Sequence, residues 1–246
     1  MDFEEQWSVR VTYHGEIQMY LTKLWYLKNI DILKCVQDEN LKRLMYFTVM
    51  SHAKTNEDIY LPEQGSNHVY FVQEGHVKLS RLNDDGRPII LDVLCPGEIF
   101  GKLALESGDL TNEFAEAADD VTFCVISRSN FQALLAQVPE LHSHLTKQIG
   151  NRVQEFEEKI ADLVFTDTTR RIINFLVRYG HDFGRSKKGP TTIEKPLSHQ
   201  EISSLTGTSP QTVAMVVDGL EKEKLIEFSN QSLVFHDLAS LKTLTQ

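Results

Sequence analysis

The spacing of hydrophobic residues changes twice along the chain. Residues 18–47 have the three- and four-residue spacing of helices, with apolar positions at Leu21, Leu24, Leu27, Leu41, Leu44 and Phe47. From about Thr48, apolar residues come in short β-rich runs that glycines interrupt, as at the hairpin signal Asp85-Gly86. This region predicts a compact antiparallel barrel or jelly roll whose last strand is residues 121–128.

A second helical pattern covers residues 138–165. Its apolar residues fall three or four positions apart and make one stripe, formed by Leu141, Leu145, Ile149, Val153, Phe156, Ile160 and Leu163. Such a stripe over about six turns can pack on the barrel or along the same helix of another subunit. We favour the second arrangement and predict a homodimer interface made of these seven residues.

The strongest chemical signal lies in residues 196–228. Ser198 and Glu201 have the spacing of a capping box at the start of one helix. Gly207 can take the left-handed conformation of a tight turn, and Ser209 with Pro210 can start a second helix. Two helices joined in this way predict a helix-turn-helix, and residues 225–237 predict a β-hairpin wing after it. A three-helix packing module without a role in DNA binding is the alternative.

The exposed face of the second helix is expected to enter the major groove of DNA. Gln211 can bond to adenine and Met215 can contact a thymine methyl, which predicts an A·T-leaning half-site. Other polar and basic residues nearby would contact phosphates and position the helix. The predicted DNA-binding residues are Ser198, His199, Gln200, Ser209, Gln211, Thr212, Met215, Arg170 and Arg171.

Composition and charge narrow the possible partners and location. The chain has 246 residues, 41% of them hydrophobic, which is enough for two compact domains. Its net charge of −10 resides in residues 1–165, with 15 basic and 26 acidic residues, whereas residues 166–246 have 10 and 9. The C-terminal part can therefore still face phosphates. Without a long apolar run or a basic leader, we expect a cytoplasmic protein with no membrane contact.

The sequence lacks the patterns of common cofactors and catalytic sites. Cys35, Cys95 and Cys124 are isolated, which argues against a disulfide framework, a structural zinc site or an iron–sulfur cluster. There is no phosphate-binding glycine-rich helix start, no GxSxG and no HExxH motif. We therefore expect no enzymatic activity and no cofactor.

Taken together, these parts resemble the Crp/Fnr superfamily of bacterial transcription regulators. The resemblance runs from about Tyr26 to the C-terminus, through residues 70–105, the helix at 138–165, TTRRIINFLVRYG and LSHQEISSLTGTSPQTV. It implies an α+β chain with a cyclic-nucleotide-binding-like jelly-roll sensor domain and N-terminal helices at 1–137, a dimerisation helix at 138–165 and a winged helix-turn-helix domain at 166–246. It also implies a homodimer that binds palindromic double-stranded DNA, with RNA polymerase as a further partner.

The same resemblance identifies an effector pocket and argues against its best-known ligand. Members that bind cyclic AMP carry a Glu for the ribose and an Arg-Ser pair for the cyclic phosphate. Here Lys102 stands at the Glu position, and Thr111 and Asn112 replace the pair. A charge-assisted pair contributes about 1.5 to 3 kcal/mol, so we expect no control by cyclic AMP. The predicted pocket residues are Gly97, Glu98, Gly101, Lys102, Leu103, Thr111, Asn112 and Phe156.

Two interpretations of Lys102 stay open. It is either a solvated side chain beside a self-filled pocket, plugged by Phe156, or the mark of a site for a different small anion. An alternative function also stays open, in which the chain is a ligand-binding or partner-binding module whose winged helix docks protein rather than DNA.

Overall fold

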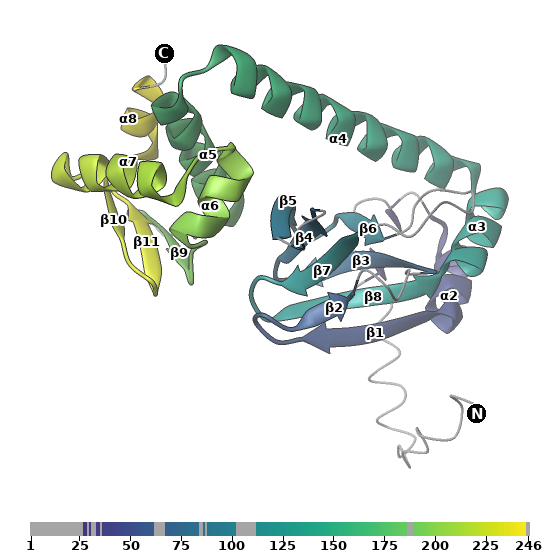
Figure 1. Ribbon diagram of the computed structural model, residues 1–246. Coiled ribbons are helices and arrows are strands. Elements are labelled where there is room, and N and C mark those ends of the chain that lie inside the picture. The colour runs from purple at the N-terminus through teal and green to yellow at the C-terminus, as the bar shows by residue number, and fades with distance from the viewer. Residues whose placement is uncertain are drawn as a thin grey trace, which may run out of the picture.

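The computed structural model describes residues 27–244, apart from positions 29, 31–32, 35, 62–66, 84–85, 87, 102–111 and 186–188. Within these residues the chain forms a β-barrel, one long helix and a small C-terminal domain, in that order (Figure 1). The long helix leads away from the barrel, and the C-terminal domain turns back toward it. The α+β organisation expected from the sequence is confirmed.

Two four-stranded antiparallel sheets face each other in the barrel. One has the strand order β1-β8-β3-β6 and the other β2-β7-β4-β5, which is a jelly-roll arrangement. The strand expected at residues 121–128 is confirmed as β8. The strands are β1 Thr48–Ala53, β2 Asp58–Tyr60, β3 His68–Glu74, β4 Val77–Leu82, β5 Pro88–Leu94, β6 Ile99–Gly101, β7 Glu113–Ala117 and β8 Val121–Ser127.

The run HVYFV in β3 is apolar at nearly every position because both faces of this strand are buried. Val69 and Phe71 point to a cluster outside the sheet, under α2 (Asp38–Phe47) and α3 (Arg128–Gln137). Tyr70 and Val72 point to the cluster between the two sheets. The barrel therefore has an inner core and an outer core on either side of one sheet.

The helical spacing expected at residues 18–47 is confirmed at its C-terminal end. Helix α2 covers Asp38–Phe47, with Leu41 and Leu44 buried in the outer core. Phe47 is 55% exposed because it is the last helical residue, just before the chain enters β1. Positions 18–26 of the predicted segment lie outside the described residues.

Helix α4 (Pro139–Phe165) corresponds to the long amphipathic pattern, but its apolar stripe divides into two parts. Leu141 and Leu145 are 0% and 8% exposed and belong to the outer core of the barrel. These two residues therefore do not contribute to an exposed seam, and that part of the prediction is corrected. The sequence period could not separate them because both parts continue the same stripe.

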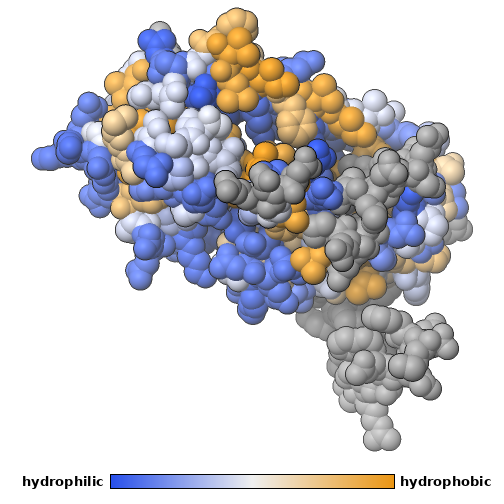
Figure 2. All heavy atoms as spheres, in the orientation of Figure 1, coloured by the Kyte–Doolittle hydropathy of each residue, from blue (hydrophilic) through white to orange (hydrophobic). Residues whose placement is uncertain are grey.

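The second part of the stripe is open to solvent. Its members are 38% to 61% exposed and are Ile149, Val153, Phe156, Ile160 and Leu163. Figure 2 shows hydrophobic side chains gathered along the upper edge of the molecule, where α4 lies in Figure 1. An isolated chain thus carries a long apolar ridge on this helix.

The C-terminal domain packs four helices against a three-stranded sheet of order β10-β11-β9. The predicted wing hairpin is confirmed as β10 and β11, which pair Ile226 with Phe235. Its core contains fully buried Ile172, Ile202 and Leu233. The elements are α5 Thr168–Phe183, β9 Thr191–Glu194, α6 His199–Thr206, α7 Pro210–Lys222, β10 Ile226–Phe228, β11 Ser232–Phe235 and α8 Leu238–Thr243.

Among the described residues, no helix has both the length and the apolar character needed to cross a membrane.

Candidate nucleic-acid interface and interdomain contacts

The helix-turn-helix is built from the local signals found in the sequence. Ser198 Oγ accepts a bond from the Glu201 backbone N–H at 3.3 Å, and the Glu201 carboxylate accepts from the Ser198 N–H at 2.8 Å. This reciprocal pair is the expected capping box of α6. Gly207 ends α6 at φ +61°, the left-handed conformation that the turn requires. Ser209 Oγ then accepts from the Thr212 N–H at 3.1 Å and caps α7.

Helix α7 has one buried face and one exposed face. Val213 and Val217 are 0% and 2% exposed and pack in the domain core. Gln211 is exposed and Met215 is 66% exposed, so both lie on the outer face as expected. Thr212 is half-buried, and its hydroxyl is 2.8 Å from Ser209 Oγ. The outer face of α7 is therefore free to enter a groove.

The predicted contacts on α6 are less uniform. Ser198 and Gln200 are exposed. His199 instead places its ring 4.9 Å from the ring of Phe228 in the wing, and its buried Nε2 has no hydrogen-bond partner among the described residues. His199 therefore packs under the wing, because it lies on the side of α6 that the hairpin covers.

Arg170 and Arg171 are neighbours in sequence but lie in different surroundings. Arg170 is exposed and pairs only loosely with Asp167, at 3.3 Å, within the first turn of α5. Arg171 turns inward: its Nε donates to the Thr206 carbonyl at 2.8 Å, and its Nη1 donates to the Thr166 carbonyl at 3.1 Å. The geometry of Arg170 fits a phosphate contact, whereas that of Arg171 fits an internal one.

A buried lysine joins the barrel to the helix-turn-helix. The Lys78 side chain, on β4, is 10% exposed and contacts both Glu116 of β7 and Glu201 of α6. Its Nζ donates to Glu201 Oε1 at 2.9 Å, while Oε2 of the same carboxylate accepts from the Ser198 N–H in the capping box. No local pattern in the sequence could predict this contact, because the two residues are 123 positions apart. Val93 of β5 adds an apolar contact to the C-terminal core.

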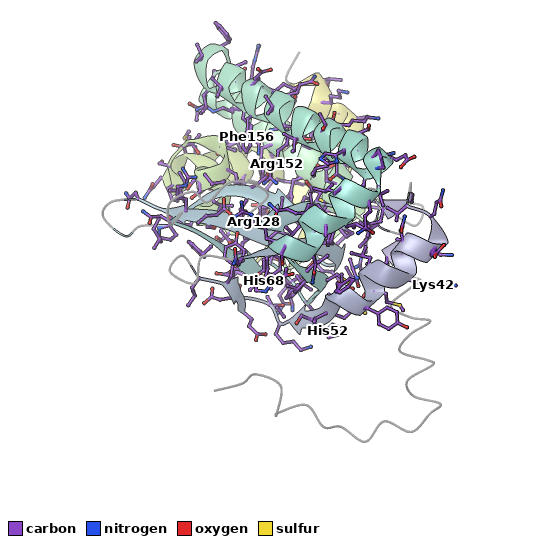
Figure 3. The ribbon with its side chains drawn as sticks, turned by 90° about the vertical axis from the view of Figure 1, so that its right-hand side faces the viewer. Lys42, His52, His68, Arg128, Arg152 and Phe156 are labelled. Atoms are coloured by element: carbon purple, nitrogen blue, oxygen red, sulfur yellow. The ribbon has the colours of Figure 1, made fainter. Side chains whose placement is uncertain are left out.

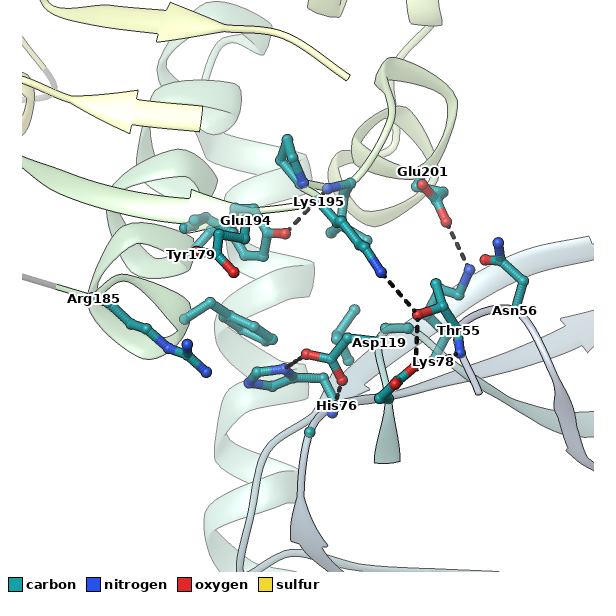
Figure 4. A pocket seen from close by; sticks show the side chains of 18 of the residues that line it. Thr55, Asn56, His76, Lys78, Asp119, Tyr179, Arg185, Glu194, Lys195 and Glu201 are labelled. Carbon is teal, nitrogen blue, oxygen red and sulfur yellow. Dashed lines mark hydrogen bonds and ion pairs between the residues drawn. The ribbon is translucent and has the colours of Figure 1, made fainter. Parts of the chain in front are cut away.

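A cavity of about 810 Å³ lies between the two domains beside this contact (Figure 4). His76, on the barrel side, bonds to Asp119 through both its backbone N–H and its ring, and the centre of its ring lies 4.3 Å from that of Phe183 of α5, tilted by 37°. Lys195, before α6, reaches the Thr55 hydroxyl at 3.4 Å. The domains therefore meet through polar contacts arranged around a hollow.

The predicted effector pocket is only partly described. Lys102, Leu103 and Thr111 lie outside the described residues, and Asn112 is exposed. Glu98 Oε2 accepts a bond from the Cys95 N–H at 2.6 Å, and burial raises the pKa of the Glu98 carboxyl.

Two of the predicted pocket glycines have left-handed backbones. Gly97 and Gly101 have φ of +95° and +90°. A Cβ at Gly101 would come within 2.7 Å of the His68 carbonyl oxygen. Only glycine fits this position, because its backbone conformation is strained for other residues and the neighbouring oxygen belongs to the backbone.

Aromatic rings fill the space between the two sheets. Tyr70 stacks on Phe100 at 4.9 Å and on Tyr60 at 5.5 Å, and all three rings are at most 6% exposed. The Tyr60 hydroxyl donates to Glu113 Oε1 at 2.7 Å. Burial, aided by the charge of Glu113, raises the pKa of Tyr60. The stacked rings leave the barrel interior closely packed in this region.

Phe156, which the sequence suggested as a plug of the effector pocket, has a partly open side chain, while residues 102–111 of that pocket lie outside the described part of the chain. It is 38% exposed, with Lys159 Nζ 5.3 Å and the Arg152 guanidinium 6.0 Å from its ring centre. Both cations reach Asp92 on β5, at 3.0 and 3.5 Å. Figure 3 places Arg152 and Phe156 along the same stretch of α4. Phe156 therefore lies at the surface of α4, above an ion-paired contact with the barrel.

The described residues contain no group of three or more His, Cys, Asp or Glu side chains that could hold a metal ion. Cys124 is a buried thiol outside any disulfide whose sulfur accepts from Gln73 Nε2 at 2.6 Å, and Cys95 is half-buried. Burial, with the nearby charge of Glu98, raises the pKa of the Cys95 thiol to about 12. Cys95 thus carries little thiolate character near neutral pH.

A jelly-roll domain joined by a long helix to a winged helix defines a class of transcription regulators that connect a sensor to a DNA-binding domain. Residues 51–138 match the cyclic nucleotide-binding domain family, and residues 170–244 match the Crp-like helix-turn-helix domain family. The chain belongs to the Crp/Fnr family and is a DNA-binding transcription regulator of this type.

Individual relatives agree with this assignment. The global nitrogen regulator of Synechococcus elongatus is 30% identical over 184 residues, which cover 74% of this chain and 83% of that protein. The cAMP-activated global transcriptional regulator CRP of Pasteurella multocida is 27% identical over 169 residues, or 68% and 80% of the two chains. A CooA mutant from Carboxydothermus hydrogenoformans has a similar structure, with a TM-score of 0.66, 25% identity and coverage of 83% and 90%.

Proposed function

We propose that this regulator acts as a homodimer on a palindromic DNA site and that cyclic AMP does not control it. The observation that carries the proposal is an open apolar seam on α4 that leads directly to a winged helix with a free reading face. The division at 1–137, 138–165 and 166–246 is part of the proposal and follows the starts of α4 and α5 closely.

The exposed part of the α4 stripe has the spacing of a two-helix seam. From Ile149 to Leu163 the apolar positions follow one another by four, three, four and three residues. An exposed ridge of this length on a monomer is a strong candidate for an interface with another protein surface. Two copies of α4 in parallel would bury it and bring both C-terminal domains to the same end of the dimer.

The reading face of α7 supports an A·T-leaning half-site. Gln211 can bond bidentately to adenine N6 and N7, and Met215 can pack on a thymine methyl. Ser198, Gln200 and Arg170 are exposed at the edge of the same surface and are proposed phosphate contacts. His199 and Arg171 are assigned no DNA contact, because both side chains are used inside the domain.

Independence from cyclic AMP rests on the residues at the pocket. Lys102 stands where a Glu would bind the ribose, and Thr111 and Asn112 lack the positive charge of the Arg that would pair with a cyclic phosphate. The stacked rings of Tyr60, Tyr70 and Phe100 occupy space between the two sheets of the barrel. Relatives of similar identity are named for nitrogen regulation and for activation by cAMP, so family membership alone does not identify the effector.

RNA polymerase is the proposed protein partner, as transcription regulation requires.

Selection of bound sequences from a pool of random duplexes tests the DNA part of the proposal. We expect a palindrome with A·T-leaning half-sites and an affinity that falls steeply with salt, because each phosphate contact releases counterions. The Gln211→Ala variant should lose preference at one base pair per half-site, worth about 1 to 3 kcal/mol. The matched variant Gln200→Ala should weaken all sequences alike. Identical base preferences in the wild type and Gln211→Ala would remove Gln211 from the reading face.

A further inference from the structure

Arg171 joins the end of the long helix to the turn of the helix-turn-helix. Its Nε donates to the carbonyl of Thr206, the last residue of α6, at 2.8 Å. Its Nη1 donates to the carbonyls of Asp162 and Thr166, at 3.4 and 3.1 Å, and also lies 3.5 Å from the Leu163 carbonyl. One guanidinium group thus bonds to two helix ends that are about forty residues apart in sequence.

The bonds from Arg171 Nη1 lie at the C-terminal end of α4, where backbone carbonyls require hydrogen-bond donors. The last four carbonyls of a helix have no intrahelical partner, and the dipole of the helix makes this end negative. The last turn of α4 contains no basic residue of its own. The Asp162 carbonyl also accepts the Thr166 backbone N–H at 3.1 Å, and Arg171, from the first turn of α5, adds further donors and the positive charge. A planar group with several donors is suited to bridge carbonyls that point in different directions.

A second contact lies at the same joint. A Cβ at Gly207 would come within 2.6 Å of Leu163 Cδ2, so the turn between α6 and α7 lies directly against α4. Arg170, the neighbouring arginine, is exposed and makes only a local pair with Asp167. Arg170 therefore provides a matched comparison for Arg171, with the same side chain on the same helix but no contact with the joint.

We propose that Arg171 is a positioning residue. It fixes the C-terminal domain to the end of α4, and in this way it sets the distance between the two copies of α7 in the proposed dimer. The inference rests on the proposed function, in which two copies of α7 bind two half-sites. With rigid joints, the separation of the two copies of α7 is fixed, and only one spacing of half-sites fits both. If the contact between α4 and the C-terminal domain is loosened, each copy of α7 can move to follow a displaced half-site.

The test measures binding to palindromes whose central spacer has the preferred length or is one base pair shorter or longer. Each added pair rotates one half-site by about 35°. We expect the wild type to bind the altered spacers at least about tenfold more weakly, comparable to a mismatched base pair. Arg171→Gln should bind the best spacer less tightly but lose less than about threefold on changing it. Arg171→Lys, which retains the charge without the planar group, should fall between them.

The Arg170→Gln variant and a salt series separate positioning from phosphate contact. Arg170→Gln should retain the spacer preference and show a shallower salt dependence, by about one unit per subunit. Arg171→Gln should lose the spacer preference with little change in the salt slope. Should Arg171→Gln fail to fold, as judged by circular dichroism, Arg171→Lys carries the comparison.

Three results would overturn the inference. Equal weakening of Arg171→Gln on all spacers would assign Arg171 a role in domain stability alone. A shallower salt slope with unchanged spacer preference would make it a phosphate contact. A wild type indifferent to spacing would refute the two-half-site proposal, and this inference with it, whereas the first two results would refute only the role of Arg171.

Discussion

The contact between Lys78 and Glu201 predicts that the barrel stabilises helix α6. We consider the variants Lys78→Met, which retains the aliphatic stem, and Glu201→Gln, which still allows a capping box. Lys78→Met leaves the carboxylates of Glu116 and Glu201 facing each other without a cation between them. Glu201→Gln removes one of those carboxylates, so it should be less harmful when Lys78 is already absent.

The expected coupling follows from the burial of the partners. Removing one member of a fully buried ion pair costs about 3 to 5 kcal/mol, whereas an exposed pair contributes about 0 to 1 kcal/mol. The side chains of Lys78 and Glu201 are 10% and 26% exposed, which lies between these cases. We therefore expect a coupling of about 1 to 3 kcal/mol from the double-mutant cycle, or roughly one to two factors of ten.

The coupling should not vary across the neutral pH range. Burial lowers the pKa of Lys78, but the hydrogen bonds it donates to Glu116 and Glu201 outweigh this and raise it above 10.5. Burial raises the pKa of Glu201, but bonds from Ser198 and Lys78 bring it below 4.5. The Lys78 contribution is complete below pH 10.5 and disappears as the pH rises through its folded-state pKa. The Glu201 contribution is complete above pH 4.5 and disappears as the pH falls through its folded-state pKa.

Hydrogen exchange of the α6 amides measures this coupling, since it reports the free energy of local opening. The Ile202 N–H, which donates to the Ser198 carbonyl at 2.9 Å, is a suitable probe in the wild type, both single variants and the double variant. Lys54 and Asp120 form a pair of similar length at 3.0 Å, but their side chains are 81% and 61% exposed. A cycle at this control pair should show no clear coupling. Equal coupling in the two cycles would mean that α6 does not rest on β4 in solution.

Two further predictions concern assembly and the effector. Phe156→Glu or Ile149→Glu should convert a dimer to monomers in analytical ultracentrifugation, because a charge would replace an apolar side chain of the seam. The control variant Gln154→Glu should leave the dimer intact. Dimers of unchanged affinity in both seam variants would contradict the interface. Calorimetry with cyclic AMP and cyclic GMP should give no saturable heat at tens of micromolar ligand, and tight binding would overturn the argument from Lys102 and Thr111.

Local signals in the sequence predicted most of the fold. The capping box at Ser198, the left-handed Gly207 and the cap at Ser209 depend on residues only a few positions apart, so their pattern is sufficient to place the two helices. The apolar stripe likewise predicted α4 within a residue of each end. It could not show that Leu141 packs on the barrel while Ile149 stays open, because periodicity gives the face of a helix and not its partner.

The contacts between domains could not be predicted in this way. Arg170 and Arg171 are both basic residues at the start of α5, and only the folded chain brings carbonyls of α4 and α6 to one of them. Lys78 lies in a strand whose neighbours Val77 and Leu79 are also buried, which marks both faces as covered. The alternation in VKL instead predicts that Lys78 faces solvent, because Val77 and Leu79 point to the opposite face of the strand, so the sequence indicated neither the burial of Lys78 nor Glu201 as its partner.

Helix α6 is held at both of its ends by different parts of the molecule. At its N-terminus Glu201 bonds to Lys78 of the barrel, and at its C-terminus the Thr206 carbonyl accepts from Arg171 of α5, which also bonds to carbonyls at the end of α4. Only Gly207, Thr208 and Ser209 separate α6 from α7, so a displacement of α6 is passed to the reading helix. The barrel and helix α4 can therefore both influence the proposed DNA-reading face of α7 without touching it.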